Sequence, residues 1–394
     1  MDLGARNPQL GSLFRGTGYA TGALRGIHAL VLVGGRQDSE RFGQFPLALL
    51  DVLGRTVLLR TLDRIRAAGV GEIAVVSDTA PLPPHAPPDS RKFSVAGPQG
   101  FWDEARQQFR RLSRHSECVL VIRLGAWAEV DFAAMVNQHR QSGSAIVRAF
   151  SPAGEALDVF VISSSSQAEA AALLRGELRD ERVNASAHHT LGYVNPLSTP
   201  ADLRALTLDA FAGDCEIHPC GRQLRPGVWV GKGARIHPCA RVLAPAFIGD
   251  SCRIRREAVV TRGSSLEHHS EVDCATVIDN SNIMSYTRVG AGLDVEYSVV
   301  GFRQVHSLLQ NAAVDIADPY LLDAATAQLS TRMTAALGWL LNLLPATGRI
   351  IFEPRVENET MSPIPALRDA SLASIEPQTK SYREMAASER YGKE

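Results

Sequence analysis

The segment from Leu224 to Val299 repeats every six residues, and this repeat limits the folds that it can adopt. Steps of six residues reach an apolar side chain each time, at Leu224, Val230, Ile236, Val242, Ile248, Ile254, Val260, Leu266, Val272, Ile278 and Met284. Small residues lie four positions after Val230 and its next seven followers, at Ala234, Ala240, Ala246, Cys252, Ala258, Ser264, Ser270 and Thr276. A single six-residue unit is too small to bury its own apolar side chain, so such units have to stack. The repeat therefore predicts a parallel β-helix over residues 211–300.

The register of the repeat shifts by one residue near Ile278. Beyond this point the inward apolar positions are expected at Val277, Ile283, Val289 and Val295, with Ser281 and Thr287 as the small residues. The pattern resembles the hexapeptide-repeat family, whose coils contain three hexads and wind in a left-handed sense. This resemblance implies a left-handed β-helix of roughly four to five coils.

Composition places the chain among globular proteins without an electrostatic preference for nucleic acid. Of the 394 residues, 45% are hydrophobic and 21% are charged, and the formal net charge is −1. A balance so close to zero favours neither nucleic acid nor an anionic membrane as a partner. The apolar run from Ala335 to Leu344 is too short to span a bilayer, and the segment from Met1 to Arg25 lacks the apolar core of a signal peptide. Six cysteines are too few for a disulfide framework in a chain of this length, so we expect a cytoplasmic protein without a transmembrane segment.

Residues 26–205 alternate strand-like and helix-like segments. The apolar run from Ile27 to Val33 ends in Gly34 and Gly35, which predicts a buried parallel strand followed by a loop. Further strands are expected at Glu72–Val76, Phe93–Ala96, Cys118–Ile122, Ala145–Ala149 and Leu157–Ile162, and helices at Val57–Ala68, Trp102–Leu112 and Asp131–Gln141. This alternation predicts an α/β domain with a doubly wound, mostly parallel sheet.

The remaining segments have simpler predicted structures. Residues 1–25 are rich in glycine and arginine, which predicts a flexible N-terminal segment. Residues 318–345 are expected to form a C-terminal helix, whose apolar side chains cover the end of the β-helix or contact another subunit. Residues 346–394 are polar and rich in proline, which predicts a largely disordered tail.

Four segments in the α/β part resemble the sugar-phosphate nucleotidyltransferases. They are the strand from Leu30 to Val33 with its two glycines, the segments Leu49–Arg55 and Arg64–Val76, and the segment Gly192–Leu203. In the family, the last of these closes the catalytic domain before a C-terminal β-helix. The resemblance covers roughly residues 26–299 and is nearest to mannose-1-phosphate guanylyltransferase and its β-helix-bearing relatives.

The resemblance implies a defined set of catalytic groups. In the family, a glycine-rich loop cradles the nucleotide phosphates, a loop arginine and a lysine after a proline neutralise charge, and two aspartates bind Mg²⁺. The loop begins here with Gly34 and Gly35, but Gln37 stands at its third glycine. The four charged positions align with uncharged residues, namely Ser39, Leu47, Gly125 and Pro196.

Our interpretation is therefore a nucleotidyltransferase-like protein of sugar-nucleotide or polysaccharide metabolism that is catalytically inactive. It would act as a regulatory or scaffolding subunit, with no catalytic residues, no metal ligands and no cofactor. A remnant of the nucleotide site is expected at Gly34, Gly35, Arg36 and Arg41. The expected partners are a nucleotide or sugar nucleotide and, through the β-helix, further copies or another protein.

Two alternatives remain open. The first is an active, Mg²⁺-dependent sugar-1-phosphate nucleotidyltransferase that uses Arg36 or Arg41 and a displaced carboxylate. Glu129 and Asp131 lie near the expected metal position, although they align with other positions of the family. The second is a hexapeptide-repeat acyltransferase with His268 or His269 as general base, whereas the simpler reading makes both histidines solvent-facing. The spacings of the other candidate zinc ligands fit no common zinc motif: His218, His237, Cys215, Cys220 and Cys239.

Overall fold

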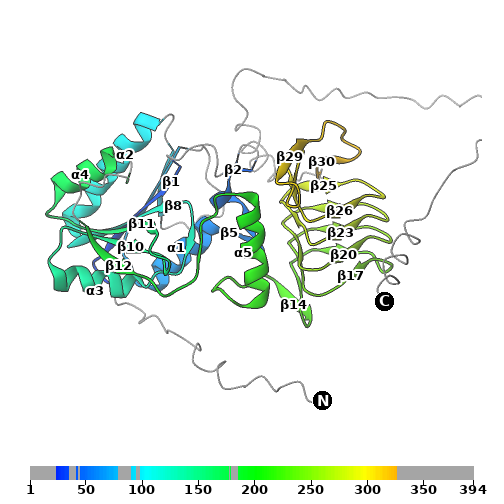
Figure 1. The fold of residues 1–394 in the computed structure, drawn as a ribbon, viewed down its shortest axis with the longest axis horizontal. Helices are drawn as coiled ribbons and strands as arrows, with labels where there is room; N and C mark the ends of the chain where they lie inside the picture. Colours follow the sequence, from blue (N-terminus) through cyan, green and yellow to red (C-terminus); the bar gives the residue numbers. More distant parts are fainter. Residues whose placement is uncertain are drawn as a thin grey trace, which may run out of the picture. The chain divides into compact units, whose positions relative to one another are not determined.

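A seven-stranded sheet forms the centre of the α/β part of the chain (Figure 1). The computed structural model describes residues 24–34, 41–42, 45–78, 90–94, 98–176, 178 and 185–325. The strand order is β12-β10-β11-β8-β1-β6-β7, and all neighbours are parallel except that β11 runs antiparallel to β10 and β8. The strands are β1 (His28–Val33), β6 (Ile73–Ser77), β7 (Ser90–Ser94), β8 (Cys118–Leu124), β10 (Ile146–Phe150), β11 (Ala156–Ser163) and β12 (Ala185–His189). The predicted, mostly parallel sheet is confirmed.

Helices cover both faces of this sheet. On one face, α2 (Pro98–Leu112) and α4 (Gln167–Arg175) pack over Leu30 and Leu32 of β1. On the other, α1 (Val57–Ala67) and α3 (Phe132–Ser142) pack over Val31 and Val33. The alternation of side chains along a strand explains why a continuous apolar run was needed: both faces of β1 are buried.

Short polar signals set the ends of the helices. The Thr56 hydroxyl accepts a hydrogen bond from the Leu59 N–H and begins α1. Asp131 does the same for α3 through the Ala134 N–H, so it caps the helix that was predicted to begin with it. Neither α4 nor a further helix, α5 (Pro200–Ala212), was predicted; α5 begins with a capping box made by Thr199 and Asp202.

Residues 222–324 form three sheets, which the chain builds up coil by coil; we call them the three-sheet region. The first sheet contains the parallel strands β15 (Val228–Val230), β18 (Ala246–Ile248), β21 (Ser264–Leu266), β24 (Asn282–Ile283) and β27 (Ser298–Gly301). The second contains β16 (Arg235–Ile236), β19 (Arg253–Ile254), β22 (Glu271–Val272) and β25 (Thr287–Val289). The third contains β17 (Arg241–Val242), β20 (Val259–Thr261), β23 (Val277–Asp279) and β26 (Asp294–Glu296). The chain visits the three sheets in rotation, which is compatible with the expected parallel β-helix.

The register of the stack matches the repeat in the sequence. Ile236 pairs with Ile254 and Ile254 with Val272, a step of eighteen residues. The next partner is Val289, so the step there is seventeen residues. The predicted shift therefore exists, but it falls after Ile278, which is fully buried in the interior, whereas Val277 points outward and was wrongly placed inside.

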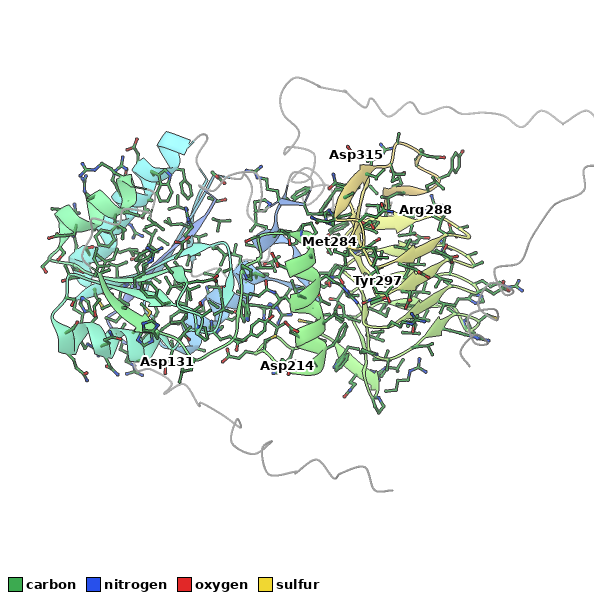
Figure 2. The ribbon with its side chains drawn as sticks, viewed as in Figure 1. Asp131, Asp214, Met284, Arg288, Tyr297 and Asp315 are labelled. Atoms are coloured by element: carbon green, nitrogen blue, oxygen red, sulfur yellow. The ribbon has the colours of Figure 1, made fainter. Side chains whose placement is uncertain are left out.

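Two members of the apolar column lie outside the interior. Leu224 is 54% exposed because it belongs to β14 (Arg222–Arg225), which pairs antiparallel with β15. Met284 follows the shift and packs into the core shared with the α/β part, at the boundary with α5 (Figure 2). The stack also begins later than residue 211, because α5 continues to Ala212.

The far end of the three-sheet region differs from the prediction. The chain turns back in β28 (Gln304–Ser307), β29 (Ala312–Asp315) and β30 (Leu322–Ala324). The helix expected from residue 318 is wrong at its start, because a turn at Asp318 leads into β30, which pairs antiparallel with β25. This pairing satisfies edge groups of β25 that a helix would have left unpaired. The rest of that predicted helix, and the segments 1–23 and 346–394, lie outside the described residues.

The β4–β5 hairpin joins the α/β part to the first sheet. Its strands are β4 (Asp51–Val52) and β5 (Arg55–Thr56), and its turn is Leu53-Gly54. The fully buried Glu267 carboxylate accepts hydrogen bonds from the Leu53 and Gly54 N–H groups, at 2.9 and 2.8 Å. Gly54 has φ +90°, and a Cβ there would lie 2.9 Å from atoms of Cys220 and Phe247, so this turn requires glycine.

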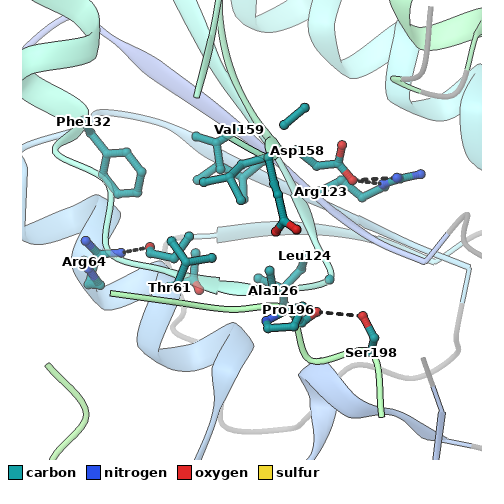
Figure 3. Close-up of a pocket in the computed structure, with 17 residues that line it drawn as sticks. Thr61, Arg64, Arg123, Leu124, Ala126, Phe132, Asp158, Val159, Pro196 and Ser198 are labelled. Carbon is teal, nitrogen blue, oxygen red and sulfur yellow. Dashed lines mark hydrogen bonds and ion pairs between the residues drawn. The ribbon is translucent and has the colours of Figure 1, made fainter. Parts of the chain in front are cut away.

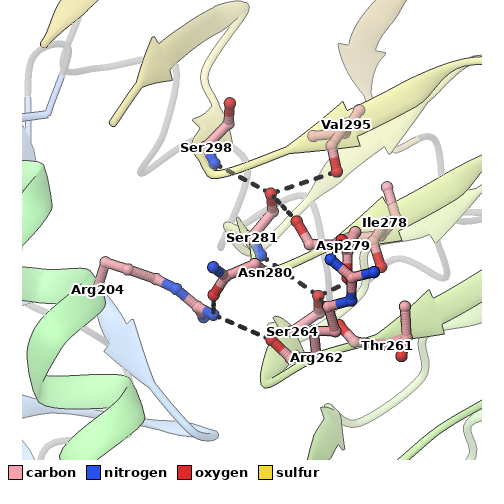
Figure 4. A network of polar contacts seen from close by, with 10 residues as sticks. All are labelled: Arg204, Thr261, Arg262, Ser264, Ile278, Asp279, Asn280, Ser281, Val295 and Ser298. Carbon is pink, nitrogen blue, oxygen red and sulfur yellow. Dashed lines mark hydrogen bonds and ion pairs between the residues drawn. The ribbon is translucent and has the colours of Figure 1, made fainter. Parts of the chain in front are cut away.

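Helix α5 supplies a second buried contact (Figure 4). Arg204, 4% exposed, donates to the Gly263 carbonyl at 2.7 Å, to the Asn282 side chain at 2.6 Å and to the Asn280 side chain. Asn282 in turn donates to the Thr207 hydroxyl at 2.8 Å.

Among the described residues, no helix is long and apolar enough to cross a membrane.

Candidate functional site

The carboxyl ends of the parallel strands bring the predicted site residues to one edge of the sheet. Val33 of β1 pairs with Leu124 of β8, so Gly34 and Gly125, the next residues, leave the sheet side by side. In open α/β sheets, ligands bind outside this edge. The structure therefore places the start of the predicted phosphate loop and the first predicted metal position next to each other.

A cavity of about 150 Å³ lies at this edge, beside the end of β8 (Figure 3). Gly125 and Pro196, the two positions that align with metal aspartates, both line it. They come from segments 71 residues apart in the sequence, and the fold brings them to one cavity. Neither side chain offers an oxygen atom to a cation. Thr61, Arg64, Arg123, Glu155, Asp158 and Ser198 provide the polar side chains of the cavity.

The buried carboxylate in the cavity is held by arginines. Asp158 of β11 accepts from the Arg123 guanidinium at 2.9 and 2.6 Å, and Arg148 lies 3.4 Å from its other oxygen. The Arg123 side chain is 1% exposed and that of Asp158 is 8% exposed. Both oxygens of this carboxylate are thus committed to cations of the protein, since a buried charge needs partners of this kind.

The residues do not fit the magnesium site that the resemblance implies. Mg²⁺ takes carboxylate oxygens in a near-octahedral arrangement, and here glycine and proline replace the two expected ligands while Asp158 is ion-paired. Within the described residues, no group of three or more His, Cys, Asp or Glu side chains is arranged to hold a metal.

Glu129 and Asp131 do not replace the missing ligands. The Glu129 carboxylate accepts from the Trp127 indole at 3.0 Å and from the Glu216 N–H at 2.5 Å, and burial raises its pKa. Asp131 caps α3. Neither of them lines the cavity, so each has a structural partner away from the aligned metal position.

Leu47, which the sequence analysis aligned with the family's lysine, lies in the core. Leu47 lies in a short 3₁₀ helix, Leu47–Leu49, and is 1% exposed. A charged ammonium there would have to be buried without a partner. Leu47 therefore packs as a core side chain.

The remnant nucleotide site is only partly described. Gly34 has φ +120°, and a Cβ there would lie 2.0 Å from the Asp78 carboxylate, so close approach of this group requires glycine. Arg41 lies in β2 (Arg41–Phe42), opposite Pro46 of β3 (Phe45–Pro46), and does not line the cavity. Gly35, Arg36, Gln37 and Ser39 lie outside the described residues.

The candidate histidines have structural contacts. His268 donates through Nε2 to the Gly54 carbonyl at 2.8 Å, and its Nδ1 accepts from the Asp250 N–H at 3.1 Å. Both nitrogens are therefore engaged, which leaves neither for an acceptor substrate. His268 is a contact of the β4–β5 hairpin, so the reading of a solvent-facing residue was wrong for it; His269 stacks on Tyr286.

Sequence reasoning missed the Arg123–Asp158 pair. A usable signal was present, because Arg123 interrupts the apolar run of β8 and Asp158 interrupts that of β11. Charged residues inside buried strands require a partner, and the antiparallel pairing of the two strands brings them together.

Comparison with known proteins gives one family match and no curated relative. Residues 29–98 match the family described as MobA-like NTP transferase domain. This match covers β1, the β4–β5 hairpin, α1, β6 and β7. No curated protein matches the chain. The start of the α/β part is therefore similar to a nucleotidyltransferase domain, in agreement with the motifs and with the sheet edge at which the cavity lies.

Proposed function

We propose that this protein is a catalytically inactive, nucleotidyltransferase-like subunit with a regulatory or scaffolding role in sugar-nucleotide or polysaccharide metabolism. The observation that carries this proposal is the cavity at the end of β8. Two positions that hold metal ligands in active relatives meet there as Gly125 and Pro196. Leu47, in place of the phosphate lysine, is buried in the core.

The losses concern the groups that contribute most to this chemistry. Phosphoryl and nucleotidyl transfer depend on metal ions and cations that stabilise developing negative charge. Removing both carboxylate ligands and the lysine eliminates those interactions together, whereas the surrounding sheet is kept. The α/β part would then bind a nucleotide or sugar nucleotide without reacting with it, and the segment at Gly34 and Gly35 would contact this ligand.

An assay of pyrophosphate release tests the catalytic part of the proposal. Purified protein is supplied with Mg²⁺, each nucleoside triphosphate in turn and common sugar 1-phosphates, with an active mannose-1-phosphate guanylyltransferase as the positive control. We expect release at the background rate. Sustained release above background would favour the alternative of an active enzyme and would end the proposal.

A thermal-shift series tests whether recognition remains. We expect nucleoside triphosphates or sugar nucleotides to raise the melting temperature in the presence of EDTA, because the cavity lacks magnesium ligands. Arg41→Ala is the test variant, and Arg225→Ala, an exposed arginine of β14, is the matched control. A shift that requires Mg²⁺, or one that both variants lose equally, contradicts recognition at the predicted position.

A further inference from the structure

The three-sheet region is divided into a positive and a negative half. Residues 222–262 contain nine Lys and Arg and two Asp and Glu, a formal charge of +7. Residues 263–325 contain two Arg and nine Asp and Glu, a formal charge of −7. Because each strand pairs with the one about eighteen residues later, order in the sequence is also order along the stack. The stack is therefore positive at its first strands and negative at its last.

The third sheet presents this division on its outer face. Arg241 is paired in register with Val259, Val259 with Val277, and Val277 with Asp294. Their neighbours Val242, Val260 and Ile278 point inward and are buried, so the four side chains form one outward row. Arg241 and Asp294 are exposed, and the two valines between them are half-buried. The row reads cation, apolar, apolar, anion.

The other two sheets offer no comparable face. The first is covered by α5 and the β4–β5 hairpin, with Phe247 1% exposed and Asn282 bonded to Thr207. On the second, Arg255 already pairs with Glu271, and Arg288 with Asp273. In the described part of the chain, neither Arg241 nor Asp294 takes part in an ion pair, although on the same sheet Arg262, next to β20, pairs with Asp279 of β23.

We propose that the third sheet is the contact surface for a second copy of this chain, related by a two-fold axis that makes the two stacks antiparallel. Such an axis, passing between Val259 and Val277, sets each Arg241 against the partner copy's anionic end of the row. The valines of both copies meet in the middle, and the positive half of each stack faces the negative half of the other. An isologous interface requires this kind of self-complementarity.

The size of the face sets the expected strength. Three strand spacings of about 4.8 Å separate Arg241 from Asp294. A face of this length buries less area than the roughly 800 Å² per partner of a standard interface. We therefore expect a weak dimer that forms at micromolar protein and that salt dissociates, because the outer charges are solvent-accessible and screened.

Reversing the charge of Arg241 or Asp294 in the full chain tests both the contact surface and the proposed two-fold axis. Sedimentation velocity is measured for the unmodified protein, for Arg241→Glu and for Asp294→Arg. Each single variant places like charges together at both ends of the row, and we expect the dimer to weaken at least tenfold. The combined variant should dimerise again, and so should an equimolar mixture of the two single variants, because both contacts are then complementary.

Arg235→Glu is the matched control. Arg235 is an exposed arginine of the second sheet, one strand before Arg241, and its reversal changes the charge of the stack equally. It should leave the dimer intact. Circular dichroism confirms that each variant is folded.

Several outcomes would overturn the inference. They are a monomer at all concentrations up to about 100 µM, a trimer, or a dimer that both reversals leave unchanged. A dimer that Arg235→Glu weakens as much as Arg241→Glu does would show a general charge effect rather than this surface. The inference extends the assembly role in the proposed function, and the two fail separately: pyrophosphate release refutes inactivity, and sedimentation refutes the dimer.

Discussion

At the scale of single residues, Glu267 is held by contacts on both of its carboxylate oxygens. It is fully buried, and its carboxylate accepts from two backbone N–H groups of the hairpin turn. Burial raises its pKa to about 7, and the negative charge of Asp51 adds to the rise. Burial opposes the charged form of His268, but Asp51 and Glu267 together raise the pKa of its imidazole above the ordinary value.

These shifts predict a pH dependence of stability. Both groups hold protons more tightly in the folded chain, so the stability linked to them is present at low pH and is lost as pH rises through their folded pKa values. For Glu267, the free energy of unfolding should fall between about pH 4.5 and 7, by at most about 1.4 kcal/mol per pH unit. Glu267→Gln should flatten this profile, as measured by urea unfolding at several pH values. Glu296→Gln, at an exposed carboxylate of β26, is the control, and equal profiles for wild type and Glu267→Gln would refute the assignment.

A second prediction concerns Leu47. Restoring the family's lysine by Leu47→Lys should not restore transfer activity, because the side chain is enclosed by the core and the metal ligands stay absent. Burying an unpaired ammonium should instead lower the free energy of unfolding by about 3–5 kcal/mol. Chemical denaturation measures this loss, with Leu47→Met as the tolerated control. A stable lysine variant that releases pyrophosphate would contradict the proposal that the other groups needed for transfer are missing.

At the scale of elements, most of the fold was predictable where the apolar pattern was strong. The strand at β1, the helices α1 and α3 and the interior column from Val242 to Ile278 follow directly from periodicity. The elements that were missed have weaker patterns: β12 is polar, and α5 carries apolar residues on its exposed side, such as Leu208, as well as on its buried face. The predicted helix after residue 318 began wrongly because pairing with β25 decided the local structure, and that pairing depends on residues more than 30 positions away.

The cavity was predictable only in part. Aligning motifs identified Gly125 and Pro196, but the partners of the cavity, Arg123 and Asp158, come together through strand pairing. The contacts of Glu267 with the hairpin turn join residues more than 200 positions apart, and no local sequence pattern predicts them.

Helix α5 gives a prediction at this scale. Burial lowers the pKa of Arg204 to about 10, so its guanidinium stays charged at neutral pH and remains bonded to carbonyl and amide oxygens. Arg204→Ala should lower the free energy of unfolding by about 2–4 kcal/mol, because it leaves those buried acceptors unpaired. Arg222→Ala, at an exposed arginine of β14, should change stability by less than about 0.5 kcal/mol. Equal effects of the two variants in denaturant titrations would argue against the contact.

At the scale of the whole molecule, the α/β part and the three-sheet region share one core. Phe247, Met284 and Val299 of the three-sheet region pack in the same cluster as α1 and β1, and Glu267 and Arg204 add buried polar contacts. We expect the two parts to unfold together, in a single calorimetric transition. Combining Glu267→Ala with Arg204→Ala should separate this into two transitions, whereas Arg222→Ala combined with Glu296→Gln should not. Two transitions in the unmodified protein would show that the shared core does not couple them.

The regular step of eighteen residues, which holds up to Ile278, has a genetic consequence. Adding or removing eighteen residues within the earlier part of the stack leaves every interior column in place, since the strands before and after still pair in register. An insertion or deletion of one residue within a hexad acts differently, because it turns the side chains that follow it from the interior to the outer face. After the seventeen-residue step, Ile283 fills the stack and Met284 faces the α/β part. In-frame changes of eighteen codons should therefore preserve the interior of the stack, whereas single-codon insertions or deletions within a hexad should disturb it.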